Sequence, residues 1–159
     1  MEAHELSRQL RGPAGSNDSL TWRRRIIAAS LAGMAAMGAV SLLQTGIVKH
    51  LPDPPLHGFD SDRVNASETA YLLGVPDGTV SFASFAANVP LAAWGGPDRA
   101  RTSPWLPLAI AGKAFVEAAV AAWYFYQMPA KEKAWCGYCI AGAVANVTIA
   151  ALTVPEARV

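Results

Sequence analysis

The chain has 159 residues, of which 52% are hydrophobic and only 16% are charged, and its mean hydropathy is +0.22. This balance is unusual for a soluble globular protein and typical of a small membrane protein with several spans. The net charge of +1 gives no basic field that would favour nucleic acid as a partner, and two cysteines can form one reversible disulfide but no disulfide framework.

Residues 1–25 are polar, contain clustered glycine, proline, serine and asparagine, and are predicted to be a flexible tail. The tail ends in three consecutive arginines, directly before an apolar run over residues 26–48. This run has membrane length and is rich in alanine and glycine, as helices that pack closely in membranes are. We therefore expect an uncleaved first membrane helix rather than a signal peptide.

The longest connection, residues 49–77, contains prolines, histidines and acidic residues and is predicted to lie outside the membrane. A short second span is expected over residues 79–94, where Pro90 interrupts the apolar run. A third span is expected over residues 105–128, and it ends in consecutive aromatic residues of the kind found at the level of lipid headgroups.

Two opposite charges lie in the middle of the predicted third span. Lys113 and Glu117 are four residues apart, so they lie on one face of a helix. A charge at that depth is costly unless it is paired or faces the interior of a bundle. The pattern predicts either a proton route close to a binding site or a structural ion pair that neutralises itself.

The only two cysteines, Cys136 and Cys139, stand at the start of a fourth apolar run that ends near Val154. At this spacing, in the first turn of a helix, they lie on one face and can form a disulfide after a small adjustment. The helix dipole and the N–H groups of the first turn favour a thiolate, most of all at Cys136. The spacing favours a redox-active dithiol over two inert buried cysteines, and no metal is expected because zinc would need two further ligands.

Four spans place both termini on one side of the membrane. The terminal side carries eight arginines and the opposite side four basic residues, so the positive-inside rule predicts cytoplasmic termini. The cysteine pair then faces outward, where disulfides persist. We therefore expect an all-α four-helix bundle integral to a membrane, with a membrane domain over residues 26–155 and a short tail over residues 156–159.

The motif Trp135-Cys136-Gly137-Tyr138-Cys139, at the head of the last span, resembles that of the vitamin K epoxide reductase family in its bacterial form. A second, weaker resemblance lies in the first outer loop, in Ser61-Asp62-Arg63-Val64, Ser67, Tyr71 and Gly74-Val75-Pro76. Together they cover about residues 24–155. The chain departs from the family in one respect. The family usually has two relay cysteines in this loop, whereas this loop has none, and Ser61 stands where one of them aligns.

The resemblance implies a membrane thiol–quinone oxidoreductase that couples disulfide formation to reduction of a menaquinone-type or ubiquinone-type quinone. It implies that Cys139 lies nearer the quinone and Cys136 nearer the outer surface, where a substrate thiol attacks. The quinone is expected against the outer loop and the aromatic residues of the third span and the motif. The residues expected to contact it are Asn65, Ser67, Tyr71, Tyr124 and Tyr138.

The expected partners are membrane lipid and a thioredoxin-like or other thiol protein on the outer side. In a bacterium, the protein would lie in the inner membrane with its cysteine pair facing the periplasm. Because the loop lacks the relay cysteines, a second hypothesis is a degenerate family member that serves as a structural or assembly subunit of a membrane complex. A third hypothesis is a module that binds quinone without turnover.

Overall fold

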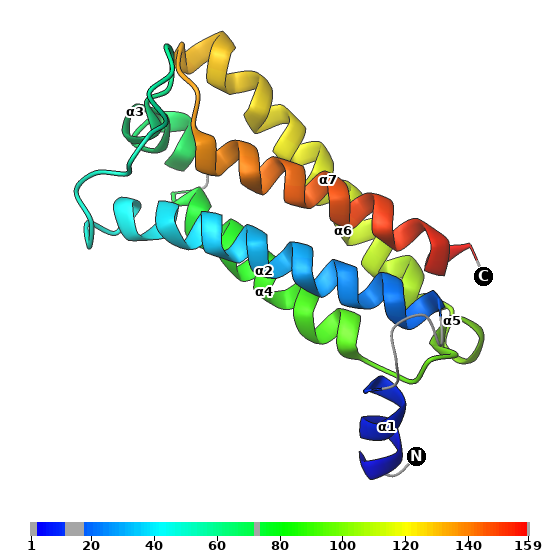
Figure 1. The fold of residues 1–159 in the computed structure, drawn as a ribbon. Coiled ribbons are helices and arrows are strands. Elements are labelled where there is room, and N and C mark those ends of the chain that lie inside the picture. Colours follow the sequence, from blue (N-terminus) through cyan, green and yellow to red (C-terminus); the bar gives the residue numbers. More distant parts are fainter. Residues whose placement is uncertain (1–2, 12–17, 72–73, 159) are drawn as a thin grey trace.

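A computed structural model describes residues 3–11, 18–71 and 74–158. Every regular element in these ranges is a helix, which confirms the all-α prediction (Figure 1). The elements in chain order are α1 (Ala3–Leu10), α2 (Asp18–Gln44), α3 (Ser61–Asn65), the 3₁₀ helix η1 (Glu68–Tyr71), α4 (Asp77–Ala93), α5 (Arg99–Thr102), α6 (Trp105–Gln127), the π turn η2 (Met128–Glu132) and α7 (Gly137–Ala157). Both α1 and the start of α2 fall within the segment predicted as a tail.

Among the described residues, three helices are long and apolar enough to cross a membrane: α2, α6 continued through η2, and α7. The chain is therefore an integral membrane protein. Helix α4 has 17 residues. At 1.5 Å per residue it is about 25 Å long, at the lower limit for a span. Of the four predicted spans, three are thus confirmed as helices of membrane length, and the second, which was expected to be short, is the shorter helix α4 that runs beside them.

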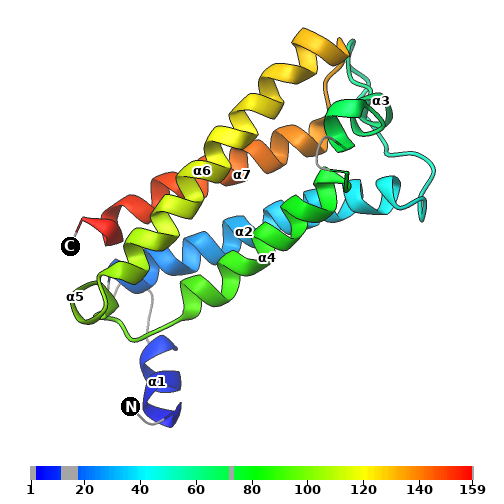
Figure 2. The ribbon, with the colours of Figure 1, turned by 180° about the vertical axis from the view of Figure 1, so that it is seen from behind.

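Helix α2 is central, because it packs along α4 on one side and along α7 on the other, while α6 packs along α7 (Figures 1 and 2). The first contact is close because Gly33 faces Phe85, whose ring lies 2.5 Å from where a Cβ at position 33 would stand. Small residues allow such approach between membrane helices. Helices α4 and α6 contact each other little, so the bundle is open on that side.

The two ends of the bundle differ. At one end lie the loop after α2, the short helices α3 and η1, and the link from α6 to the start of α7 (Figure 1). At the other end lie α5, α1 and the end of α7 (Figure 2). The described parts of both termini are therefore at the same end, which is the arrangement that an even number of passes along the bundle produces.

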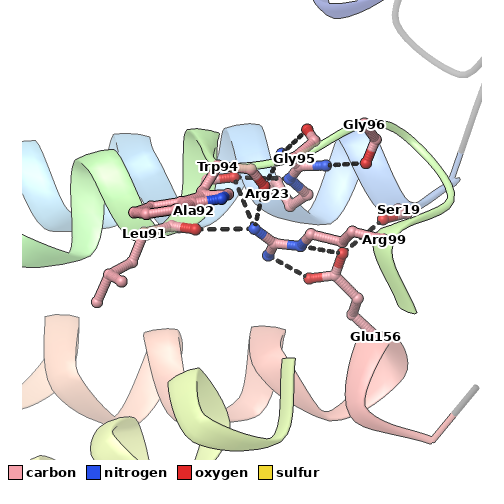
Figure 3. Close-up of polar contacts among 9 residues, drawn as sticks. All are labelled: Ser19, Arg23, Leu91, Ala92, Trp94, Gly95, Gly96, Arg99 and Glu156. Atoms are coloured by element: carbon pink, nitrogen blue, oxygen red, sulfur yellow. Dashed lines mark hydrogen bonds and ion pairs between the residues drawn. The ribbon is translucent and has the colours of Figure 1, made fainter. Parts of the chain in front are cut away.

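Two buried arginines close the end opposite the cysteines (Figure 3). The guanidinium of Arg23 donates hydrogen bonds of 2.6–3.0 Å to four backbone carbonyls at the end of α4 and just after it, those of Ala92, Trp94, Gly95 and Gly96. Arg99 donates to one further carbonyl in this stretch, that of Leu91, and shares the carbonyl of Trp94 with Arg23. It also binds both carboxylate oxygens of Glu156 in α7, at 2.8 and 2.6 Å. The last carbonyls of a helix have no hydrogen-bond partners within the helix, and here the two arginine side chains provide such partners at the end of α4.

Candidate functional site

The two cysteines lie at the N-terminus of α7 and form a disulfide. Cys136 has extended backbone and is the N-cap of the helix, and its Sγ accepts the backbone N–H of Cys139 at 3.1 Å. An N-cap normally satisfies one of the free donors of the first turn through a side-chain oxygen, and here sulfur takes that place. When the pair is reduced, the same N–H and the helix dipole stabilise a thiolate on Cys136.

The two sulfurs are in different surroundings. Cys136 has an exposed fraction of 0% and packs among Val64, Met128 and Ala134. Cys139 is only partly buried. The structure therefore shields the sulfur that was expected near the outer surface. A thiol that attacks Cys136 must first displace part of the loop or of the α6–α7 link.

Asn65, at the end of α3, contacts both sulfurs. Its side-chain Nδ2 donates to Sγ of Cys136 at 3.3 Å, and its Oδ1 lies 3.5 Å from Sγ of Cys139. The latter contact becomes a hydrogen bond when Cys139 is a thiol. Asn65 is itself fixed, because Nδ2 also donates to the carbonyl of Ser61 at 2.7 Å, and its exposed fraction is 2%. A rigid amide thus orients the dithiol.

Residues 51–60, called the strap below, run past the start of α7. The backbone of Trp135 donates to Gly58 and accepts from Asp60, at 2.7 and 2.9 Å. The hydroxyl of Tyr138 donates to the carbonyl of Pro52 at 3.0 Å. The strap therefore lies against the cysteine motif through three hydrogen bonds, which helps to explain the burial of Cys136.

Ser61, which stands where a relay cysteine aligns, is fully buried and joined to the strap by Asp53. The carboxylate of Asp53 accepts the Ser61 backbone N–H at 2.8 Å and the Ser61 hydroxyl at 2.6 Å. Hydrogen bonds to a carboxylate are among the stronger ones in proteins. The Asp53–Ser61 pair therefore holds the strap against α3 through hydrogen bonds, at a position where a relay cysteine would otherwise stand. Sequence reasoning missed Asp53, because only the folded loop brings it to Ser61.

A second acidic residue ties the start of the loop to α3. Asp62 contacts Nδ1 of His50 and accepts the backbone N–H of Leu51 at 2.9 Å. The hydrogen bond and the charge of Asp62 raise the pKa of His50 above 6.5. Burial acts to raise the pKa of Asp62, but the hydrogen bonds from His50 and Leu51 outweigh it and lower that pKa below 3.8. The charged pair therefore weakens as the pH rises through the raised pKa of His50.

A cavity of about 200 Å³ lies beside the disulfide and reaches the open side between α4 and α6. Its wall is mostly apolar, with Val40 and Phe85 from the α2–α4 side and Val120 from α6. Cys139 lines it, and Cys136 is not among the lining residues. A flat apolar molecule that enters from the lipid would therefore meet the sulfur of Cys139 first.

The structure brings together some of the predicted site residues and separates others. Asn65, Ser67 and Tyr124 line the cavity together with Cys139. Tyr71 and Tyr138 do not line it. The hydroxyl of Tyr71 lies 3.4 Å from the carbonyl of Gln44, while that of Tyr138 binds the strap.

Glu117 also lines the cavity. The ammonium of Lys113, one helical turn away in α6, donates to Oε1 of Glu117 at 2.5 Å. The cavity wall includes further polar residues that the sequence did not single out, among them Thr69 and Glu132. The hydroxyl of Thr69 donates to the carboxylate of Glu132 at 2.8 Å, and so joins η1 to η2.

The chain matches the vitamin K epoxide reductase family over residues 24–154, which include all four long helices in whole or in large part, the loop and the cysteine pair. Members of this family are quinone-dependent thiol oxidoreductases. Searches of curated proteins and of solved structures each gave no match. A helical membrane bundle with a Cys-x-x-Cys disulfide at the head of its last helix agrees with the family match, and the chain belongs to the vitamin K epoxide reductase family.

Proposed function

We propose that this protein is a membrane oxidoreductase that passes electrons from thiols to a quinone through Cys136 and Cys139. The observation that carries the proposal is that Cys139 lines a mostly apolar cavity on the side of the bundle where α4 and α6 make few contacts. A redox-active sulfur next to such a cavity is suited to an apolar electron acceptor dissolved in the membrane.

The reaction balances as a two-electron exchange. The thiols of Cys136 and Cys139 lose two electrons and two protons as the S–S bond forms, and the quinone gains two electrons and two protons to become the hydroquinone. The disulfide is then reduced by an external dithiol through a mixed disulfide at Cys136. Asn65 holds both sulfurs and stabilises the thiolate that starts each exchange.

The residues of the cavity fit a quinone of the menaquinone or ubiquinone type. The ring would lie between apolar side chains and the aromatic ring of Tyr124, with Asn65 and Ser67 near one carbonyl oxygen. Tyr71 and Tyr138, which do not line the cavity, would act through the loop instead. The open side between α4 and α6 would admit a polyprenyl tail from the lipid.

Orientation follows from the basic residues, with cytoplasmic termini and the cysteines on the periplasmic side of a bacterial inner membrane. The partner that supplies electrons would be a thioredoxin-like or other thiol protein on that outer side. Single cysteines at two exposed positions, His57→Cys in the strap and Thr102→Cys at the opposite end, test this in a chain without Cys136 and Cys139. An impermeant maleimide on intact cells should label only the former, and the reverse result would invert the orientation.

The competing proposal is a degenerate family member that acts as a structural or assembly subunit. It is favoured by the complete burial of Cys136 and by a loop that Asp53 and Ser61 close without sulfur. On this proposal, the disulfide would be a permanent structural cross-link at the start of α7, and quinone would not change its redox state.

A thiol titration separates these proposals. The protein is purified in mild detergent, reduced with a small dithiol and freed of reductant, and its two thiols are counted before and after addition of a quinone. We expect both thiols to disappear as one hydroquinone forms per chain, measured by ultraviolet absorbance. Thiols that persist would favour the structural subunit. If quinone binds and the thiols still persist, the protein is a binding module without turnover.

A further inference from the structure

A polar cluster lies in the cavity wall where side chains in the middle of α4 and α6 meet. The ammonium of Lys113 donates to the side chain of Asn88 at 2.7 Å, to the backbone carbonyl of Ser84 at 3.1 Å and to Oε1 of Glu117 at 2.5 Å. The hydroxyl of Ser84 donates to the same Oε1. Oxygen Oε1 of Glu117 therefore receives two donors.

The other carboxylate oxygen of Glu117 is buried and has no hydrogen-bond partner within the described ranges, and Nδ2 of Asn88 is in the same situation. An unpaired buried polar atom costs roughly 1–3 kcal/mol, and more when the group is charged. A structural ion pair that served only to neutralise itself would be expected to satisfy these atoms internally. The cluster is instead built with one free carboxylate oxygen on a residue that lines the cavity.

Polar residues line the cavity at two levels, near the cysteines and again at Ser84 and Glu117, and Ser81 of α4 lies between these levels. Cys139 and Asn65 lie near the outer end of the helices. Ser84 is seven residues into α4 and Glu117 is ten residues before the end of α6. At 1.5 Å per residue these two lie about 10–15 Å below the outer helix ends. A para-quinone has the same pattern, with two carbonyl oxygens at opposite ends of an apolar ring.

We propose that Glu117, in its carboxylic acid form, donates a hydrogen bond to the carbonyl oxygen of the quinone that lies farther from the disulfide, and protonates it. The proposal rests on the function proposed above. Each hydroquinone needs one proton on each oxygen, and the cysteines can serve only the nearer oxygen directly. The carboxyl of Glu117 delivers a proton to the far oxygen and is reprotonated by the ammonium of Lys113. Lys113 regains its proton from solvent, which receives the proton released by the second thiol, so the overall balance of one dithiol to one hydroquinone is kept.

The test compares Glu117→Gln alone, and combined with Lys113→Met, with wild type. The glutamine keeps size and polarity but carries no transferable proton. The double variant also removes the partly buried ammonium that would otherwise lose its charged partner, so this variant decides the outcome if the single variant does not fold. Glu68→Gln is the matched control, because it makes the same change at an exposed carboxylate on the same side of the molecule that does not line the cavity.

We expect the double variant to lower kcat for quinone reduction at least about 10-fold, since positioned proton donors contribute on the order of 10²–10⁴-fold. The pH dependence of kcat should change, while binding of the oxidised quinone, followed by tryptophan fluorescence, should be kept, because the glutamine amide can still donate a hydrogen bond to the carbonyl oxygen. Oxidation of the dithiol by diamide, which needs no quinone, should be unchanged, and the control variant should behave as wild type throughout.

Wild-type values of kcat and of its pH profile in the double variant would overturn the inference and leave the proposed function intact. If the wild-type protein itself does not reduce quinone while diamide still oxidises its thiols, the proposed function fails and the inference falls with it.

Discussion

Replacing either cysteine by serine is expected to abolish electron transfer from a small dithiol to quinone, because each exchange step needs sulfur on both sides. The two single variants should differ in what they accumulate. With Cys139→Ser, a partner thiol that has joined Cys136 cannot be displaced, so a mixed disulfide should persist and be visible on a non-reducing gel. With Cys136→Ser, that adduct should be absent.

The burial of Cys136 adds a condition to this result. Because its exposed fraction is 0%, adduct formation requires a covering segment to move, and we expect that segment to be the strap. In the Cys139→Ser background, Asp53→Ala removes both hydrogen bonds that join the strap to Ser61 and should increase the rate of adduct formation. His57→Ala, an exposed change in the same strap, is the control and should leave the rate unchanged.

Two results would contradict this account. Full activity in both single cysteine variants would make the dithiol dispensable and would favour the structural-subunit proposal. An adduct rate that does not respond to Asp53→Ala would mean that the thiol reaches Cys136 by another route, for example past the α6–α7 link.

The second large effect is expected at the opposite end of the bundle, from Glu156→Ala. This change leaves Arg99 buried without its carboxylate partner, and loss of one member of a buried ion pair costs about 3–5 kcal/mol. The free energy of unfolding in detergent should fall by that amount, because α7 loses its connection to α5 and to the end of α4 (Figure 3).

The matched control for this prediction is Glu5→Ala, which breaks the exposed ion pair with Arg8 in α1 and should cost at most about 1 kcal/mol. Glu156→Gln keeps one acceptor oxygen for Arg99 and should fall between the two. If Glu156→Ala unfolds within about 1 kcal/mol of wild type, solvent or lipid headgroups compensate the arginine and the pair does not stabilise the fold in the way described here.

The helices and the position of the dithiol could be predicted because both depend on local properties of the chain. Apolar runs of membrane length determine where α2, α6 and α7 lie, whatever packs against them. The spacing of Cys136 and Cys139 places both sulfurs on one face of the first turn of α7. The boundaries were less accurate, since α2 begins inside the predicted tail and α4 is shorter than a typical span.

The site and its burial were decided only by tertiary structure, because they depend on residues far apart in the chain. Asn65 reaches Cys136 across 71 positions, and Arg99 reaches Glu156 across 57. A count of basic residues treats Arg23 as a topology signal, whereas the packing of α2 on α4 makes it a buried donor to the end of α4. Hydropathy and residue spacing can be read from the local sequence. Whether a polar side chain is exposed to solvent or paired with another group depends on which helices pack together.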